Sequence, residues 1–380
     1  MKIQNPALLP ELKTCPAVFA VENEYQIMVP VKSDVLFWVE VNGKCYYDHC
    51  NGILRSDTRL HRARVPMSEL DAAGAYTIFY RKIIERKPYF SETEEPVSAT
   101  YSFIPVKTQG DIHMYHLSDT HGRFEHPAAA ADFFGDELDV LILNGDIPDH
   151  SGDVKNFDLI YELCGHLTGG NKPCVFSRGN HDMRGICAEH FTEYTPTRDG
   201  HSYYSFRIGP IWGLLMDCSE DKNDDAPGYG NTISCHAFRA EETAWMEQQM
   251  ARFEAEAHAP GVQYRFVISH IPFAQIFAEA RFAIEHPRYT HWLKLLGTHI
   301  QPQLHICGHT HRVELNQVGS EKDGLGQVCP VVIGGRPVRD EEKGVLDYYG
   351  CALTLHGDGI KVEFTNSRKE VLDSHEIPLQ

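Results

Sequence analysis

The chain has 380 residues, a length typical of about two domains. Its formal net charge of -18 excludes a surface that wraps nucleic acid, because such surfaces bind phosphates through many Lys and Arg side chains. The charge does not exclude a small phosphorylated substrate, since bound cations can dominate the local charge of a site.

The first part of the chain, up to about residue 105, has the pattern of short strands separated by turns. Asn42-Gly43 lies between the apolar run 36–41 and Lys44–Tyr47, and an Asn-Gly pair in this position predicts a β-hairpin. Further strands are expected at 25–29, 75–81 and 100–104. Together these signals predict an all-β sandwich of the fibronectin III or immunoglobulin type over residues 1–107.

The pattern changes near Pro105, where strands begin to alternate with helices. Helices are expected at 153–167 and 240–253, and this alternation predicts a layered α/β domain over residues 108–380. Three later runs, at 328–333, 348–355 and 360–365, have the pattern of strands. The segment 217–236 is rich in Asp and Gly and predicts a long loop, either a substrate-shaping lid or a plain surface excursion.

Five apolar runs of this second domain each end at residues that can bind metal ions. They are His116–His121, Val140–Asp146, Val175–Asp182, Phe266–His270 and Leu304–His311. Sites in α/β sheets form at the carboxyl ends of strands, so five such ends can meet in one crevice. Two of the blocks hold ligand pairs separated by one residue, which places both side chains on one face of an extended segment.

The candidate ligands are carboxylates, imidazoles and one amide. They are Asp119, His121, Asp146, Asn180, His270, His309 and His311. This set suits Mn, Fe, Zn or Ni, and the lack of cysteine in it argues against a structural zinc site. Seven ligands would crowd one metal ion, so we expect two ions that share Asp146 as a bridge.

The order Asp-x-His, Gly-Asp, Gly-Asn-His-Asp, His and Gly-His-Thr-His resembles the calcineurin-like metallophosphoesterase family over about residues 111–312. The resemblance implies a four-layer αββα sandwich with a dinuclear centre. It also implies a role for each residue: Asp119, His121 and His311 at the first metal, Asn180, His270 and His309 at the second, Asp146 as the bridge, His181 as the acid and Asp149 as its partner.

The chain departs from two known subfamilies. The N-terminal sandwich loosely resembles that of purple acid phosphatases, but Asp149 stands where their metal-binding Tyr would fall, and His121 has no counterpart there. A tyrosinate-bound iron site is therefore not expected. His150 replaces the Arg that helps to hold phosphate in protein Ser/Thr phosphatases, which argues against protein-phosphatase activity.

We expect an enzyme that hydrolyses phosphate monoesters or diesters of a small substrate. A metal-bridging hydroxide would attack, His181 would protonate the leaving oxygen, Asp149 would orient His181, and Arg184 would contact phosphate. One alternative is a metal-binding scaffold without catalysis, against which the pairing of His181 with Asp149 counts. Another is that the sandwich binds a carbohydrate or a partner and carries the enzyme with it.

The chain is expected in the cytoplasm. Its eleven cysteines have no spacing typical of a disulfide framework, and its first residues lack the apolar stretch of a signal peptide. No run of about 18 apolar residues predicts a membrane span. The residue pattern leaves the metal identity, the choice between monoester and diester, and the oligomeric state open.

Overall fold

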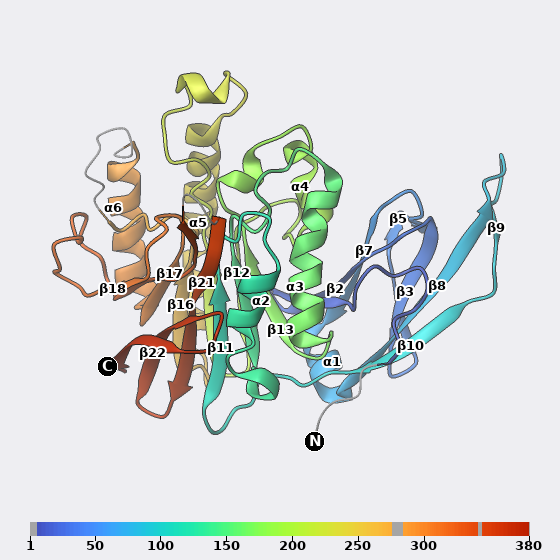
Figure 1. Cartoon of the computed structure of the whole chain (residues 1–380), viewed down its shortest axis with the longest axis horizontal. Coiled ribbons are helices and arrows are strands. Elements are labelled where there is room, and N and C mark those ends of the chain that lie inside the picture. Colours follow the sequence, from blue (N-terminus) through green and yellow to red (C-terminus); the bar gives the residue numbers. More distant parts are fainter. Residues whose placement is uncertain (1–5, 276–283, 341–343, 380) are drawn as a thin grey trace.

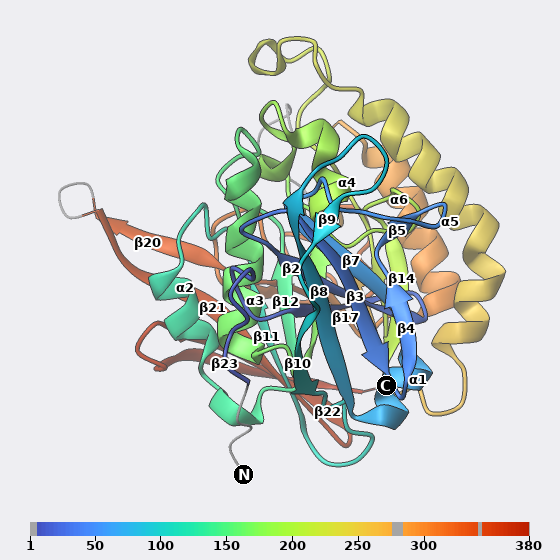
Figure 2. The same cartoon turned by 90° about the vertical axis from the view of Figure 1, so that its right-hand side faces the viewer.

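The computed structural model describes residues 6–275, 284–340 and 344–379 of the chain. From residue 112 onward the chain forms four layers, in which two β-sheets lie face to face and helices cover the outer side of each sheet (Figures 1 and 2). This arrangement confirms the predicted αββα fold. None of the described helices is both long and apolar enough to cross a membrane.

The first sheet has the strand order β23-β22-β21-β11-β12-β13-β1-β2-β7, with β20 beside β21. Its strands β11, β12 and β13 are parallel, whereas β21, β22 and β23 are antiparallel. The bounds are β1 (Ala17–Val21), β2 (Glu24–Pro30), β7 (Leu60–Pro66), β11 (Ile112–Leu117), β12 (Val140–Asn144), β13 (Pro173–Ser177), β20 (Arg336–Asp340), β21 (Gly344–His356), β22 (Gly359–Asn366) and β23 (Val371–Pro378).

The second sheet has the strand order β14-β15-β16-β17-β19-β18, and β15, β16, β17 and β19 are parallel. Its strands are β14 (Tyr204–Ile208), β15 (Ile211–Leu215), β16 (Tyr264–Ile268), β17 (Leu304–Cys307), β18 (Glu314–Asn316) and β19 (Val331–Ile333). Two helices, α2 (Glu125–Ala131) and α3 (Asp158–Thr168), cover the first sheet. The helices α5 (Cys235–Ala257) and α6 (His286–Leu295) cover the second. Shorter turns are η1 (Gly135–Glu137), η2 (Val154–Phe157), η3 (His181–Met183), η4 (Ala188–His190), α4 (Phe191–Tyr194), η5 (Pro227–Tyr229) and the π-helical η7 (Leu296–Ile300).

The strands that lead to the site are apolar along their whole length because both faces of each sheet are buried. In β12, Val140 and Ile142 lie in the core between the two sheets, while Leu141 and Leu143 pack under α2 and α3. In β16, Val267 packs under α5 and α6 in the same way. The polar residues that follow these strands are therefore held at the ends of rigid, doubly covered elements.

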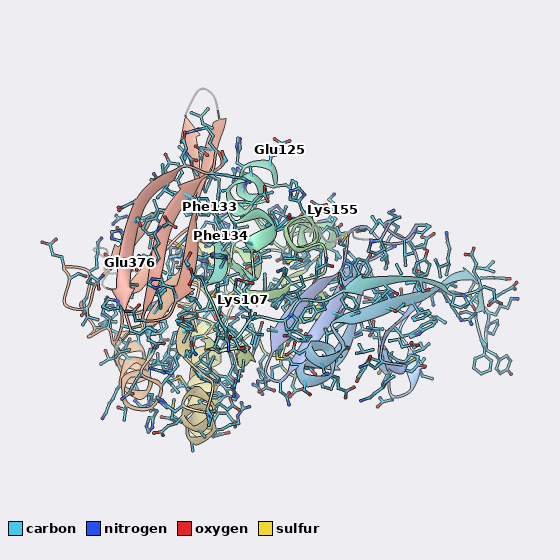
Figure 3. All side chains as sticks on the ribbon, turned by 90° about the horizontal axis from the view of Figure 1, so that it is seen from below. Lys107, Glu125, Phe133, Phe134, Lys155 and Glu376 are labelled. Carbon is cyan, nitrogen blue, oxygen red and sulfur yellow. The ribbon has the colours of Figure 1, made fainter. Side chains whose placement is uncertain are left out.

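The N-terminal part forms a further sheet with the strand order β10-β8-β3-β4 and β9 beside β8. One face of this sheet packs on β2 and β7: Val35, Phe37 and Val39 share a core with Ile27 and Val65. In Figures 1 and 3 the sheet extends away from the four layers. The remaining N-terminal elements are β3 (Val35–Val41), β4 (Lys44–Tyr47), β5 (His49–Cys50), β6 (Ile53–Leu54), α1 (Met67–Ala73), β8 (Ala75–Glu85), β9 (Glu92–Thr93) and β10 (Val97–Ser102).

The predicted Asn-Gly hairpin is confirmed. β3 and β4 pair antiparallel across Asn42 and Gly43, whose φ angles are +49° and +79°. Both residues lie in the left-handed region that a two-residue hairpin turn of this kind requires. The local sequence therefore decided this turn.

The predicted boundary after residue 107 lies between β10 and β11. The first sheet nevertheless continues into the N-terminal part, because β1 pairs in parallel with β13 and is followed by β2 and β7. One hydrogen-bonded sheet thus contains strands from both sides of the boundary. The division of the chain into two domains at this point stays a prediction.

Candidate metal centre

The seven candidate ligands follow five strands that end at one edge of the two facing sheets. Asp119 and His121 follow β11, Asp146 follows β12, and Asn180 follows β13. His270 follows β16, and the last two histidines follow β17. The structure brings all seven side chains into two adjoining groups that meet at Asp119.

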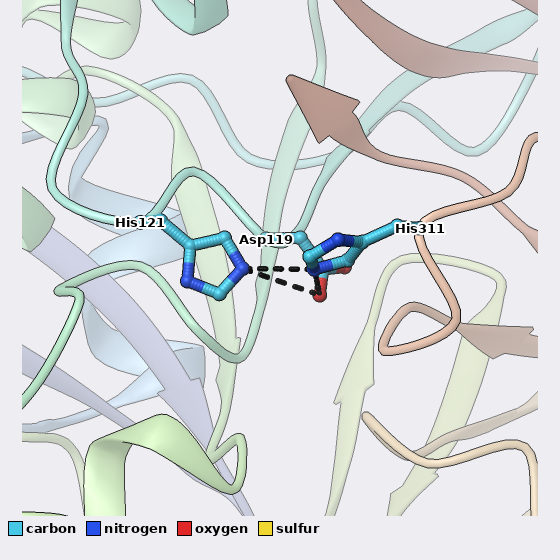
Figure 4. A group of neighbouring side chains, drawn as sticks. All are labelled: Asp119, His121 and His311. Atoms are coloured by element: carbon cyan, nitrogen blue, oxygen red, sulfur yellow. Dashed lines mark hydrogen bonds and ion pairs between the residues drawn. The ribbon is translucent and has the colours of Figure 1, made fainter. Parts of the chain in front are cut away.

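The first group holds Asp119, His121 and His311 (Figure 4). The Nε2 atoms of the two histidines are 2.9 Å apart, and they lie 4.0 Å and 3.3 Å from Asp119 Oδ1. Asp119 is fully buried, whereas His311 is exposed. Two imidazole nitrogens and a carboxylate oxygen thus face a common point that is open toward solvent on one side.

The second group lies around Asp146 and His270. His270 Nε2 is 3.2 Å from Asp146 Oδ2 and 3.8 Å from Asp119 Oδ1, which joins the two groups. His270 Nδ1 lies 2.7 Å from the carbonyl oxygen of Asn144, and donation to that oxygen leaves Nε2 as the ligand atom. The side chains of Asn180 and His309 also meet here, with 3.0 Å between Oδ1 and Nδ1.

The residues of both groups fit a metal centre. Asp119 Oδ1 and His270 Nε2 are buried and form no well-directed hydrogen bond within the described part of the chain. Buried polar atoms are rarely left in this state without an ion or water to satisfy them. Burial lowers the pKa of His270, but the facing carboxylates of Asp146 and Asp119 raise it by more, to about 10. The site therefore favours positive charge.

The ligands stand on strained backbone. The φ angles of Asp119, His121, Asp146, His309 and His311 are +54°, +47°, +54°, +69° and +53°. Each non-glycine residue in this left-handed region destabilises the folded chain by about 1–3 kcal/mol, and such residues are concentrated at functional sites. Five ligands in this conformation indicate that the fold imposes the ligand geometry at the expense of local backbone stability.

Glycines allow the turns to approach one another. A Cβ on Gly145 would lie 2.6 Å from Gly179 Cα and from His270 Nδ1, and a Cβ on Gly179 would lie 2.3 Å from Asp146 Oδ1. Asp182, the last residue of the block Val175–Asp182, accepts the backbone N–H groups of Gly179 and Asp146 at 2.6 Å and 3.2 Å. The carboxylate of Asp182 thus holds the turn after β12 against the turn after β13.

His181 lies half-buried beside the first group. Its Nδ1 donates to the backbone carbonyl of Asp149 at 2.9 Å, and its Nε2 accepts from Arg184 at 2.8 Å, because a guanidinium only donates. The Asp149 carboxylate is nearer to His121 Nδ1, at 3.1 Å, than to His181 Nδ1, at 3.9 Å. The roles of these side chains in catalysis stay predictions.

Two acidic residues of the segment 217–236, which the sequence predicts to be a long loop, also contact the site. Glu220 is buried and binds Arg184 through two hydrogen bonds of 2.6 Å and 2.9 Å, and it accepts from Asn180 Nδ2 at 3.3 Å. Asp221 Oδ2 lies 3.1 Å from His309 Nε2. Both residues come soon after the apolar strand β15, so the strand-end pattern of the other blocks is the signal that could have found them.

The comparisons with known proteins agree with this fold. The model of the calcineurin-like phosphoesterase family matches residues 112–313. A purple acid phosphatase from yellow lupin (Lupinus luteus) has a similar fold, with a TM-score of 0.58 and 10% identity over 98% of this chain and 75% of that one. The structure of PhoD is similar with a TM-score of 0.53 and 12% identity, over 97% of this chain and 90% of that one.

A sequence comparison with curated proteins gives no match. At 10% and 12% identity, the two solved structures show a shared fold. The family match covers more than half of the chain and contains all five strand-end blocks. On this ground the chain belongs to the calcineurin-like phosphoesterase family.

Proposed function

We propose that the protein hydrolyses phosphate esters of a small substrate with the help of two metal ions. The observation that supports this most directly is the convergence of seven candidate ligand side chains from five strand ends, with His181 beside them. Asp119, His121 and His311 would hold one ion, Asn180, His270 and His309 the other, and Asp146 both. Bound there, the ions would supply Lewis-acid polarisation of the phosphate and a more acidic water molecule as nucleophile.

Side chains of the protein would position a proton donor beside the leaving group. His181 Nδ1 is fixed by the carbonyl of Asp149, which leaves Nε2 as the nitrogen that can face the substrate. Arg184 now donates to that nitrogen. A substrate phosphate oxygen can compete for the same guanidinium N–H, so that binding frees Nε2 to take up a proton from solvent. The imidazolium formed in this way can then give that proton to the leaving oxygen.

Only one hydrogen bond of Arg184 would change when phosphate binds. Its Nε and Nη2 stay with Glu220, while Nη1 is the atom that turns from His181 to phosphate. The phosphorus–oxygen bond to the leaving group breaks, and the leaving oxygen takes the Nε2 proton of His181. Water supplies the new oxygen on phosphorus and releases a proton to solvent, which leaves His181 neutral. General acid catalysis of this kind accelerates a reaction by about 10²–10⁴-fold.

Metal analysis coupled to two assays tests the proposal. We expect two metal ions per chain and turnover of p-nitrophenyl phosphate, of bis-p-nitrophenyl phosphate, or of both. His181→Asn should keep the metal content and lose about 10²–10⁴-fold in turnover. His356→Asn is the matched control, since its side chain is 33% exposed against 29% for His181 and lies in β21.

Three outcomes would contradict the proposal. A chain that binds no metal ion would remove the ligand assignment. A fully loaded chain without turnover of either ester would favour the metal-binding scaffold instead. Unchanged turnover of His181→Asn would show that another group supplies the proton.

A further inference from the structure

A large cavity lies beside the candidate metal centre. Two loop segments form its walls: residues 183–189, which follow the turn that carries His181, and the acidic loop 220–233. Its volume is about 1370 Å³. Pockets for small organic ligands usually measure about 300–1,000 Å³, so the cavity has room for a sizeable organic group.

Arg184 connects this cavity to the proposed proton donor. Its side chain belongs to the cavity wall, and its Nη1 donates to His181 Nε2 at 2.8 Å. The group that receives a proton from His181 is the leaving oxygen, which must lie within hydrogen-bond reach of Nε2. The organic part attached to that oxygen therefore extends toward Arg184 and into the cavity.

The charges of the wall restrict what can bind. Arg184 is neutralised by the buried carboxylate of Glu220, and Lys222 Nζ forms an ion pair with Asp221 at 2.7 Å. Tyr229 donates its hydroxyl group to this acidic pair of residues, at 3.0 Å from Glu220 and 3.2 Å from Asp221. Both cationic side chains of the wall are thus already matched by carboxylates.

The rest of the described wall adds acidic and apolar groups. Glu189 and Asp225 contribute two further carboxylates, while Ile186, Ile233 and the ring of Tyr229 contribute apolar surface. A polyanionic group would meet excess negative charge here, which is unfavourable at short range. A neutral or cationic group with an apolar part would instead cover the isoleucines and the ring.

We propose that this cavity binds the leaving group of the substrate and selects a neutral or cationic, partly apolar group, such as an arene or an aryl amine. The inference rests on the proposed phosphoesterase function and narrows its substrate class. It disfavours leaving groups that carry further phosphates. Ile186 is the position at which the selectivity can be changed, because its side chain is 83% exposed and lies on the wall.

Three aryl phosphates that differ only in a remote charge test the proposal. They are 4-ethylphenyl, 4-(trimethylammoniomethyl)phenyl and 4-(sulfomethyl)phenyl phosphate, assayed on the metal-loaded full chain. We expect kcat/KM to be higher for the neutral and cationic esters than for the sulfonate. The cationic ester and the sulfonate should differ by about tenfold, because their opposite charges interact differently with the acidic wall near the protein surface. The methylene group keeps the three leaving oxygens similar in basicity.

A charge-changing variant isolates the contribution of the cavity. Ile186→Lys should shift the ratio of sulfonate to trimethylammonium kcat/KM by about fivefold to tenfold toward the sulfonate. Ile53→Lys is the matched control, because Ile53 is 74% exposed and lies in β6 of the N-terminal part. Contributions of the shared phosphate and of the metal ions cancel in this comparison.

The outcomes separate the two proposals. No hydrolysis of any of the three esters, together with no hydrolysis of bis-p-nitrophenyl phosphate, by the metal-loaded chain defeats the proposed function itself. Hydrolysis of bis-p-nitrophenyl phosphate alone leaves the phosphoesterase function standing and overturns the inferred selectivity for these leaving groups. Hydrolysis with a preference for the sulfonate overturns the inferred selectivity. In the last outcome the esters are hydrolysed, but Ile186→Lys shifts the ratio of sulfonate to trimethylammonium kcat/KM no more than Ile53→Lys does. That result would show that the cavity does not bind the substrate, while the phosphoesterase function stands.

Discussion

The carboxylate of Glu220 joins three side chains of the site. It holds Arg184 by two hydrogen bonds, accepts from the amide of Asn180 and accepts from the hydroxyl of Tyr229. The contact with Asn180 fixes which end of the amide faces His309, so Oδ1 would be the ligand atom in the proposed metal centre. A group that orients a ligand in this way affects metal binding without touching the metal.

Glu220→Gln should weaken metal binding and turnover together. The Gln amide has one acceptor oxygen and no negative charge, so it cannot replace the two hydrogen bonds of the carboxylate to Arg184. Loss of a group that orients a metal ligand lowers metal affinity or activity by about 10–100-fold. Metal titration followed by an assay at saturating metal would measure both effects. Glu376→Gln, at an exposed position of β23 that Figure 3 labels, is the control. Wild-type metal affinity in Glu220→Gln would contradict the positioning role.

Glu242 makes the stability of the fold depend on pH. It is fully buried, and Oε1 accepts the backbone N–H of Asp217 at 3.0 Å while Oε2 has no described partner. Burial, together with the charge of Asp217, raises the pKa of Glu242 well above its ordinary value. The folded chain therefore retains a proton that the unfolded chain loses near pH 4.3.

The sign of this dependence follows from proton release. The contribution of Glu242 to the free energy of unfolding is fully present below the pKa of this group in the unfolded chain. It is lost as the pH rises toward the pKa in the folded chain, by up to about 1.4 kcal/mol per pH unit. Glu242→Gln should remove that slope, whereas Glu241→Gln, at the exposed neighbouring position, should keep it. Urea unfolding from pH 5 to pH 8 measures the difference, and equal slopes in the two variants would refute the prediction.

At the scale of elements, the site is a set of interlocked turns. The turn after β12 touches the turn after β13 at Gly145 and Gly179, and His270 of the second sheet lies against Gly145. The backbone of His121 donates to the carbonyl of Asp146, which joins the turn after β11 to the same group. Displacing one turn therefore moves ligands that belong to others.

Gly145→Ala tests this interlocking. Its Cβ would lie 2.6 Å from His270 Nδ1 and from Gly179 Cα, on a backbone with a φ of +76°. Gly43→Ala is the control: its φ is +79°, and a Cβ there would meet no atom within 4 Å. Both variants should lose about 1–2 kcal/mol of stability from backbone strain. Only Gly145→Ala should unfold at still lower denaturant and bind less metal, and equal metal content would contradict the model of interlocked turns.

At the scale of the whole molecule, the first sheet joins the N-terminal part to the four layers of the phosphoesterase domain. β1 pairs with β13 at Val18 and Phe19, and the ring of Phe19 packs against Tyr161 of α3 and Phe176 of β13. The outlying end of β8 and β9 projects away from this junction (Figure 1). Removal of the two regions should therefore have different consequences.

A fragment of residues 108–380 should aggregate. It would uncover the edge of β13 and the apolar surface around Tyr161, and an open apolar strand edge promotes association. A chain that lacks only residues 88–91, where Tyr89 and Phe90 are 93% and 88% exposed, should stay folded and soluble. Size-exclusion chromatography and thermal unfolding measure both. A monomeric, stable 108–380 fragment would instead support an independent catalytic domain.

Local patterns in the sequence determined much of this protein. The Asn42-Gly43 hairpin follows from two residues that tolerate positive φ, and the strands that lead to the site follow from short apolar runs buried on both faces. The order of the five candidate ligand blocks predicts the calcineurin-like phosphoesterase family, and the family match over residues 112–313 confirms it. These features could be predicted because each depends on residues that are close in the chain.

The tertiary structure decided what depends on distant contacts. Glu220 and Asp221 follow a strand as the other blocks do, but their contacts with Asn180 and His309 arise because their loop crosses the ends of β13 and β17. Asp149 faces His121 because two turns meet. The union of β1 with β13 likewise joins strands more than 150 residues apart. Such contacts arise from packing of whole elements, and no spacing in the sequence encodes which loop will lie over which strand end.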